Sequence, residues 1–302
     1  MIYLLLGILC SSSIALIFKH TETQNLNRYG ITSVNYIAAS LVSLFMMLKV
    51  KSVHYSLNLP EAFSQFGDII SKTSDQLGYS GSTLWAIALG ILTGACFYYS
   101  FIYYQKSVRE CGATLSGMFG KLGILIPMIV SVVLWRELPT GFQTLGIILS
   151  MLSIIMVNYD SSNSNFKWQS TLVLLFLFGG LAEFSNKLFQ KYAITDYKSL
   201  FLFVIFAIAF LVSLSSTIRH GKRINFKDIF WGFLVGIPNL FSSFFLIMAL
   251  DHLPTTVVFP VYSAGSIIVI LLGSTLLYKE AIRKKDWIAI CTTIVALILI
   301  NV

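Results

Sequence analysis

The stretch SLFLFVIFAIAFLVSLSSTI, at residues 199–218, has no charged residue and is long enough to cross the hydrocarbon layer of a membrane as an α-helix. Nine other stretches have a similar length and few charges, and within them only Lys121, Glu183 and Lys187 are charged. The chain is 56% hydrophobic and 11% charged, whereas soluble domains are roughly 25% charged. We therefore predict an all-α membrane protein with ten transmembrane helices, at residues 1–18, 29–48, 84–104, 111–135, 141–159, 168–190, 199–218, 229–250, 252–278 and 287–302.

Besides the α-helix, a closed β-barrel is the other structure that can hydrogen-bond all of its backbone N–H and C=O groups within a membrane. Barrel strands alternate apolar and polar residues over about ten positions, whereas residues 199–218 and 252–278 are almost continuously apolar. Tryptophans support the helix boundaries, because an indole prefers the membrane–water interface, where its ring is buried and its N–H stays hydrated. All five lie at an end of a predicted span: Trp85, Trp135, Trp168, Trp231 and Trp287.

The two halves of the chain resemble each other. Trp85 and Gly90 recur at an offset of 146, and Trp135-Arg136-Glu137 recurs as a similar triplet at an offset of 143. The second members of these pairs are Trp231, Gly236 and Tyr278-Lys279-Glu280. We therefore predict two five-helix repeats, residues 1–159 and 168–302, and because five is odd the second repeat must enter the membrane from the opposite side. Inverted repeats of this kind recur in transporters, with the substrate site near the midplane.

Residues 49–83 form the longest predicted loop outside the membrane. Apolar residues recur in it at helical spacing, namely Ala62, Phe63, Phe66, Ile69 and Ile70. This spacing favours a helix that lies on the membrane surface over a disordered link.

Loop charges bear on the orientation of the chain. Of the 21 Lys and Arg residues, 13 fall in loops on the side opposite the termini and six on the side of the termini. The positive-inside rule therefore favours termini that face outward.

The repeated motifs resemble those of the EamA-type families of the drug/metabolite transporter superfamily. The resemblance rests on Trp85, Gly90 and Glu137 in the first half, on their second-half counterparts, and on the segment from Met248 to Pro254 followed by Pro260. It implies a central cavity lined by helices 1, 3, 4, 6, 8 and 9, and transport by alternating access. The resemblance also implies that both termini lie in the cytoplasm. The loop charges favour the opposite orientation, so the orientation of the chain stays open.

Lys121 is the most informative single residue. It lies ten residues into the predicted helix at 111–135, about 15 Å from that end at 1.5 Å per residue, too deep for its ammonium group to reach water along the helix. A charge at that depth is costly unless it faces a cavity or a partner. We expect Lys121 to contact an anionic group of the substrate; the alternative is a fixed ion pair with Glu183.

Glu183 and Lys187 lie four residues apart on one predicted helix and can pair along one face. Such a pair can simply neutralise both charges. Alternatively, a partly dehydrated Glu183 takes up and releases a proton during transport.

Polar and aromatic residues form stripes on three predicted helices, and we expect these stripes to line the cavity. The alternatives are packing for the aromatic residues and hydrogen bonds to their own helix for the serines. The stripes comprise Thr93, Phe97, Ser100 and Tyr104; Asn239 and Ser243; and Tyr262, Ser263 and Ser266. Small-residue pairs at Gly90/Gly94 and Gly232/Gly236 predict close helix packing, with dimerisation as the alternative.

These features predict a secondary active transporter or facilitator that moves a small organic metabolite through a central cavity by alternating access. Lys121 favours an amino acid or an organic anion as the substrate. The alternatives are a membrane-embedded enzyme that uses Glu183 as an acid or base, and an exporter of cationic compounds. We expect a multi-pass protein of the cell (inner) membrane, monomeric or homodimeric, whose partners are its substrate and the lipid bilayer.

No catalytic residues, cofactor or metal site are predicted. The sequence has no nucleotide-binding loop motif, and its histidines are scattered, at His20, His54, His220 and His252. Its formal charge of +8 does not indicate nucleic acid, because the basic residues flank the predicted spans, where they face lipid headgroups.

Overall fold

The computed structural model describes residues 2–49, 57–71, 76–123, 125–127, 130, 140–160, 165–166, 169–220, 223–252, 255–282 and 284–300. Its helices are α1 (Ile2–Thr23), α2 (Arg28–Lys49), α3 (Leu59–Ile70), α4 (Tyr79–Cys111), α5 (Ala113–Leu122), α7 (Gly141–Asn158), α8 (Ser170–Tyr192), α9 (Lys198–His220), α10 (Phe226–His252), α11 (Thr255–Tyr278) and α12 (Lys284–Ile300). A short 3₁₀ helix, η1 (Thr195–Tyr197), precedes α9, and the two-residue strands β1 (Tyr159–Asp160) and β2 (Asn165–Phe166) pair antiparallel.

Seven of the helices are long and apolar enough to cross a membrane, and shorter apolar helices occur in α5, α7 and α12. The prediction of an all-α, multi-pass membrane protein is therefore confirmed. The count of ten spans stays a prediction. Several residues used at the sequence level lie outside the described ranges: Trp135, Arg136, Glu137, Trp168 and Pro254.

The chain folds into two compact units, and each unit draws on both predicted repeats. Unit 1 comprises Met1–Arg28, Tyr99–Leu181 and Phe241–Val302, and unit 2 comprises Tyr29–Tyr98 and Ala182–Leu240. The division of the sequence into repeats at 1–159 and 168–302 stays a prediction.

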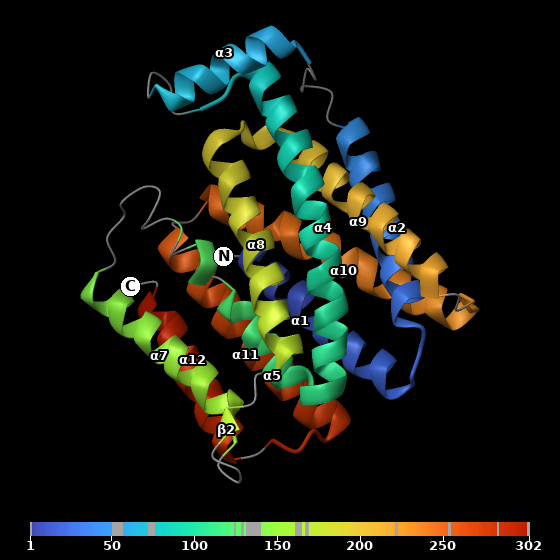
Figure 1. Cartoon of the computed structure of the whole chain (residues 1–302), viewed down its shortest axis with the longest axis vertical. Coiled ribbons are helices and arrows are strands. Elements are labelled where there is room, and N and C mark those ends of the chain that lie inside the picture. The colour runs from blue at the N-terminus through green and yellow to red at the C-terminus, as the bar shows by residue number, and fades with distance from the viewer. Residues whose placement is uncertain are drawn as a thin grey trace. The chain divides into compact units, whose positions relative to one another are not determined.

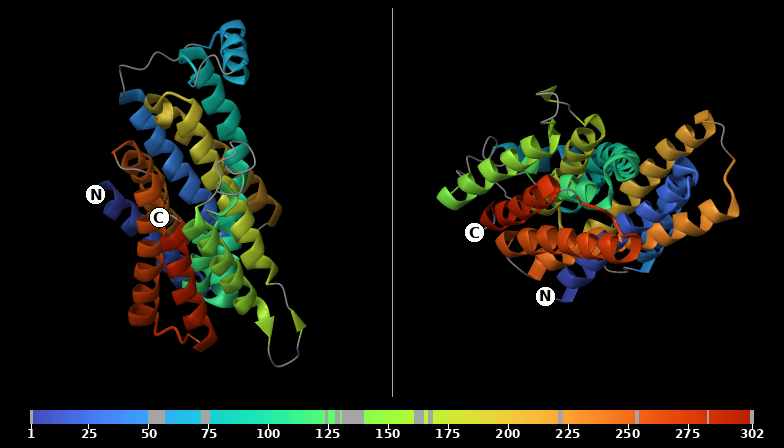
Figure 2. Two further views of the ribbon diagram at one scale, coloured as in Figure 1. Left: turned by 90° about the vertical axis from the view of Figure 1, so that its left-hand side faces the viewer. Right: turned by 90° about the horizontal axis from the view of Figure 1, so that it is seen from below.

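Unit 1 is built around α11, which packs against α1 and α5, while α7 packs along α12. Figures 1 and 2 show α7 and α12 side by side in every view. The core of the unit joins Met118, Phe119 and Leu122 of α5 to Leu175 of α8 and Ile267 of α11. A buried hydrogen bond of 2.9 Å between Thr293 and Ser153 links α12 to α7. Most of the unit is thus held by apolar contacts between helices that are distant in sequence.

Unit 2 is held together by close helix crossings at small residues. A Cβ atom on Gly94 of α4 would lie 2.7 Å from the carbonyl oxygen of Ile205 on α9. A Cβ atom on Gly236 of α10 would lie 2.6 Å from the carbonyl oxygen of Asn35 on α2. Backbones approach this closely only where a side chain is missing. The predicted packing role of the small-residue pairs within one chain is therefore confirmed.

Two predicted segments differ in the structure. The helix expected at residues 111–135 is not continuous over the described residues, because α5 ends at Leu122, Gly123 forms a turn and helix resumes at 125–127. At this turn the backbone of α8 approaches closely, because a Cβ atom on Gly123 would lie 2.8 Å from the backbone nitrogen of Gly180. In the loop at 49–83, α3 is the helix that the apolar spacing indicated.

Candidate substrate-binding site

Lys121 lies in the last turn of α5, about 12 Å along the helix from its first residue at 1.5 Å per residue. Its ammonium nitrogen donates a hydrogen bond of 2.8 Å to the hydroxyl of Ser11 on α1. The same nitrogen lies over the ring of Tyr262 on α11, 3.9 Å from the ring centroid. The Lys121 residue is half-buried. Three helices of unit 1 thus converge on one ammonium group.

The close approach of α1 and α11 brings Ser11 and Tyr262 to the same place. A Cβ atom on Gly7 would lie 3.3 Å from the Tyr262 ring, and a Cβ atom on Gly265 would lie 2.8 Å from the Ile8 side chain. Both distances are short, so a larger residue at either position would require the neighbouring side chain to move. The Tyr262 ring is buried, and its position over Lys121 is therefore fixed by backbone packing.

Sequence reasoning predicted Lys121 and Tyr262 but missed Ser11. The available signal was the run of three serines at Ser11, Ser12 and Ser13 in an otherwise apolar first helix. The Ser12 hydroxyl donates to the carbonyl of Ile8 on its own helix at 2.7 Å, and it lies 3.3 Å from the carbonyl of Ser266 on α11. Only the interhelical contacts distinguish the role of Ser11 from that of its neighbours.

Other predicted site residues of unit 1 have structural contacts. The hydroxyl of Ser266 donates to the carbonyl of Tyr262 at 2.6 Å, which is the bonding to its own helix that was the alternative for this serine. Tyr104 packs edge-on against Phe18 with ring centroids 5.6 Å apart. Ser243 and Ser263 are buried, and Ser100 is half-buried beside Gly179, where a Cβ atom would lie 3.6 Å from its hydroxyl.

The remaining predicted residues belong to unit 2. The hydroxyl of Thr93 donates to the carbonyl of Leu89 one turn earlier, at 2.7 Å. Phe97 packs edge-on against Phe206, with ring centroids 5.9 Å apart, in agreement with the packing alternative for the aromatic residues.

Two further residues complete the predicted set. The side-chain amide of Asn239 donates to the side-chain oxygen of Asn35 at 3.1 Å, and both side chains are buried. Glu183 is half-buried on α8. Its predicted pairing with Lys121 or Lys187 and its proton-coupling role stay predictions.

Comparison with known proteins identifies the family. The model of the EamA-like transporter family matches residues 1–159 and again residues 170–302. The chain belongs to the EamA-like transporter family. An EamA-like protein is a transporter of the drug/metabolite transporter superfamily, so the resemblance seen in the motifs is confirmed.

Relatives of this EamA-like protein are distant. It is 22% identical over 300 residues to an uncharacterized protein of Haemophilus influenzae, covering 97% of this chain and 95% of the relative. It is 32% identical over 76 residues to the probable 4-amino-4-deoxy-L-arabinose-phosphoundecaprenol flippase subunit ArnE of Proteus mirabilis, covering 25% of this chain and 66% of ArnE. A protein of known crystal structure shares the fold, with a TM-score of 0.59 and 13% identity over 99% of this chain and 94% of that one.

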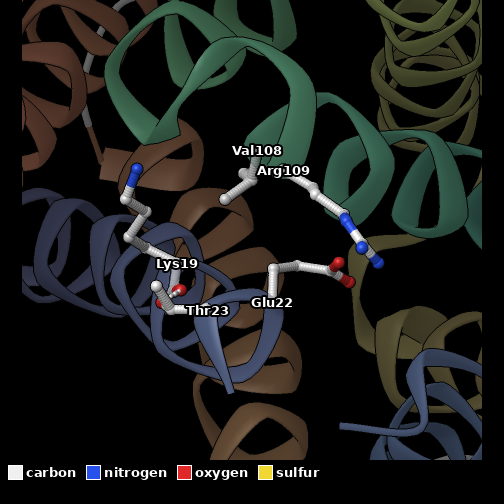
Figure 3. A pocket seen from close by; sticks show the side chains of 5 residues that line it. All are labelled: Lys19, Glu22, Thr23, Val108 and Arg109. Carbon is white, nitrogen blue, oxygen red and sulfur yellow. Dashed lines mark hydrogen bonds between the residues drawn. The ribbon is translucent and has the colours of Figure 1, made fainter. Parts of the chain in front are cut away.

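The EamA-like chain also has a charged cavity in unit 1, where α1 and α4 end. The cavity has a volume of about 190 Å³ and is lined by Lys19, Glu22, Thr23, Val108 and Arg109. Figure 3 shows Glu22 and Arg109 extending to one side of it and Lys19 to the other.

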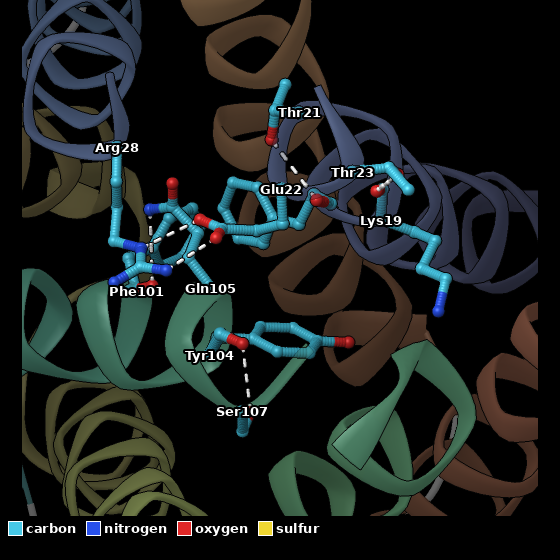
Figure 4. Close-up of polar contacts among 10 residues, drawn as sticks. Lys19, Thr21, Glu22, Thr23, Arg28, Phe101, Tyr104, Gln105 and Ser107 are labelled. Carbon is cyan, nitrogen blue, oxygen red and sulfur yellow. Dashed lines mark hydrogen bonds and ion pairs between the residues drawn. The ribbon is translucent and has the colours of Figure 1, made fainter. Parts of the chain in front are cut away.

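Glu22, one of the residues that line this cavity, is also part of an ion pair. The Arg28 guanidinium donates two hydrogen bonds to the Glu22 carboxylate, at 2.7 and 2.5 Å (Figure 4). Both side chains are largely buried, and the bidentate geometry fixes the turn between α1 and α2. Nearby, Lys19 lies 3.7 Å from Glu280, the acidic residue of the second-half motif.

Within the described part of the chain, no group of three or more His, Cys, Asp or Glu side chains is placed to hold a metal ion. The cysteines Cys10, Cys96, Cys111 and Cys291 are free thiols.

Proposed function

We propose that this EamA-like protein is a secondary transporter that moves a small organic metabolite by alternating access, and that the metabolite carries an anionic group. Amino acids and organic acids are the favoured substrates. The observation that carries the proposal is the position of the Lys121 ammonium group, 2.8 Å from the Ser11 hydroxyl and 3.9 Å from the Tyr262 ring centroid.

The chemistry of these two contacts supports anion recognition. A hydroxyl oxygen and an aromatic ring face are neutral groups, and these two contacts orient the ammonium of Lys121. An intramembrane charge that is costly to bury marks a functional site by default. A carboxylate or phosphate that approaches Lys121 would gain a charge-assisted hydrogen bond, and the Ser11 hydroxyl can rotate to donate a second one.

Counterflow in proteoliposomes tests the proposal. Purified protein is reconstituted, loaded with unlabelled metabolites from a panel of amino acids, monocarboxylates and dicarboxylates, and assayed for accumulation of the labelled compound. We expect saturable counterflow of an anionic member of the panel, and its loss in Lys121→Gln. Lys106→Gln is the matched control, because Lys106 also lies over an aromatic ring, 5.4 Å from the centroid of Tyr103, but near the end of α4. Equal transport by both variants would refute the role of Lys121.

We further propose that Glu183 couples transport to a proton gradient. The Glu183 residue is half-buried and its carboxyl oxygen Oε2 is buried. A carboxyl group that is partly removed from water is costly to ionise, so it can take up a proton and release it when the site opens to water. We expect Glu183→Gln to retain counterflow, which needs no net proton movement, and to lose accumulation driven by a pH gradient. Gradient-driven accumulation that survives in Glu183→Gln would refute the coupling.

The protein is proposed to act without a cofactor, in the cell membrane, as a monomer or homodimer, and not as an enzyme. Mass spectrometry of the counterflow compounds separates a carrier from a membrane-embedded enzyme. A carrier returns its substrate chemically unchanged, whereas an enzyme would convert it without flux.

A second candidate function follows from the match to ArnE, a probable subunit of a 4-amino-4-deoxy-L-arabinose-phosphoundecaprenol flippase. A lipid-linked phosphate is also an anion that Lys121 could attract. The two functions differ in the solubility of the substrate. Flipping of a fluorescent polyprenyl phosphate in the same proteoliposomes, without counterflow of any water-soluble metabolite, would favour the flippase.

A further inference from the structure

Helix α3 has three chemically distinct faces. Leu59, Phe63, Gly67 and Ile70 follow one another at intervals of four, four and three residues, and form an apolar stripe along the helix. Glu61, Ser64 and Asp68 form a polar stripe, and the third face contains Ala62, Gln65, Phe66 and Ile69. A surface helix of a soluble protein needs only two faces, one for the core and one for water.

The third face is the one that contacts the rest of unit 2. The Gln65 side-chain oxygen accepts a hydrogen bond of 2.9 Å from the backbone N–H of Gly81. Phe66 packs against Trp85 with ring centroids 5.9 Å apart, and Ala62 is buried. At the edge of this face, the Ser80 hydroxyl donates to the Glu61 carboxylate at 2.9 Å. These contacts fix the rotation of α3 about its own axis.

With this rotation, the apolar stripe of α3 points away from the rest of unit 2. Leu59 is 46% exposed, Phe63 is 65% exposed and Ile70 is 83% exposed. The polar stripe is exposed as well, at Glu61, Ser64 and Asp68. The apolar stripe is therefore turned away from the protein, in a direction different from that of the polar stripe.

The connectivity of α3 places the stripe at the face of the membrane. α3 follows α2 and precedes α4, which are both candidate membrane spans, and it docks on the first turn of α4 at Ser80 and Gly81. Trp85 follows one turn later, where an indole marks the interface. Figure 1 shows α3 running crosswise over the beginning of α4. A helix in this position has protein on one side, water on another and lipid on the third.

We propose that α3 lies in the headgroup layer of the bilayer, with Leu59, Phe63 and Ile70 inserted among the upper acyl chains. The occupant of its apolar stripe is the lipid leaflet that also surrounds α4. Docking through Gln65 and Phe66 then ties the beginning of α4 to the lipid surface. Burial of apolar area drives the insertion. Anionic headgroups contribute little, because the water-facing stripe carries the acidic residues Glu61 and Asp68.

Nitroxide scanning of the full-length protein in phosphatidylcholine nanodiscs tests the proposal. The four free cysteines are replaced by serine, and single cysteines are introduced and spin-labelled at the positions of α3. Phe63→Cys reports on the apolar stripe, and Ser64→Cys, one residue further, is the matched control on the polar stripe. Accessibility to oxygen, which concentrates in lipid, is compared with accessibility to a water-soluble nickel chelate.

We expect the ratio of oxygen to nickel accessibility to follow the helical period, high at positions 59, 63 and 70 and low at 64 and 68. Replacing half of the phosphatidylcholine with phosphatidylglycerol should leave the ratio at position 63 unchanged. Equal nickel accessibility at 63 and 64 would show that the stripe faces water and would overturn the proposal. Protection of position 63 from both reagents, together with disulfide-linked dimers of Phe63→Cys, would assign the stripe to a second copy of the chain and would also overturn it.

Discussion

The ammonium nitrogen of Lys121 on α5 lies 3.9 Å from the centroid of the Tyr262 ring on α11. The ring is buried and packs beside Gly7 of α1, so the aromatic face stays under the ammonium group. The contact orients the charge toward the Ser11 hydroxyl, 2.8 Å away. An electrostatic attraction to the ring thus holds a long, flexible side chain in one direction within a membrane helix.

Substitution of Tyr262 separates the aromatic face from the tyrosine hydroxyl. Tyr262→Phe keeps the ring and should retain transport, whereas Tyr262→Leu removes the cation–π contact. The cation–π contact contributes about 1 kcal/mol to holding Lys121 in place. Its loss should raise the KM for an anionic substrate by about fivefold, with little change in maximal rate. Concentration-dependent counterflow measures both parameters. Similar KM values for the Phe and Leu variants would show that the ring does not position Lys121.

The crossing of α5 and α8 in unit 1 predicts a stability effect at glycines. A Cβ atom on Gly180 would lie 2.5 Å from the carbonyl oxygen of Gly123, a backbone atom that cannot move aside, whereas a Cβ atom on Gly120 would meet its nearest neighbour at 4.0 Å. Gly180→Ala should therefore cost about 1–3 kcal/mol through overpacking. Gly120→Ala should be neutral or stabilising, since alanine favours helix by about 1 kcal/mol. Thermal unfolding in detergent compares the two, and equal melting temperatures would contradict the crossing.

How far the sequence could predict the site depends on the kind of information each residue carries. Lys121 could be found because a charge within an apolar run is costly wherever the helix packs. Ser11 could not, because a serine in a membrane helix bonds as readily to its own backbone as to a neighbour, and Ser12 and Ser266 beside it do so. The role of Ser11 depends on a contact between α1 and α5 that no periodicity encodes.

The same limit applies to the fold. Helices were predictable because hydrophobic length alone specifies a membrane span. The end of α5 at Leu122 was not predictable, because the backbone that approaches Gly123 most closely belongs to Gly180 on α8, which is distant in sequence. The cavity-lining role of Asn239, inferred from its place on a stripe, stays a prediction; its hydrogen bond to the buried side chain of Asn35 on another helix could not be read from the sequence.

Gly112, the residue before α5, and Glu280 should be energetically coupled. Gly112 has φ = +87° and ψ = 165°, a conformation that is almost exclusive to glycine, and a Cβ atom there would lie 1.6 Å from a Glu280 carboxylate oxygen. Gly112→Ala should cost about 1–3 kcal/mol in backbone strain and displace Glu280 from Lys19.

A double-mutant cycle with Glu280→Ala isolates the second effect. In the Gly112→Ala background the carboxylate has already moved, so Glu280→Ala should cost about 1 kcal/mol less than it does in the wild type. Denaturation midpoints of the four proteins give the difference. Strict additivity would show that Glu280 does not rest against Gly112.

Substitutions in the buried amide pair of Asn35 on α2 and Asn239 on α10 test whether Asn239 has a structural or a substrate-binding role. The Asn239 amide donates to the Asn35 side-chain oxygen at 3.1 Å, so Asn239→Leu leaves a buried polar group of Asn35 without this bond and should destabilise the fold by about 1–3 kcal/mol. Replacing both residues by leucine should restore much of that loss, because no amide then remains unpaired at this position. Neither change should alter the KM for transport, which is measured by counterflow beside thermal unfolding. A tenfold rise in KM for Asn239→Leu at unchanged stability would instead place Asn239 in contact with the substrate, as its stripe on the helix first indicated.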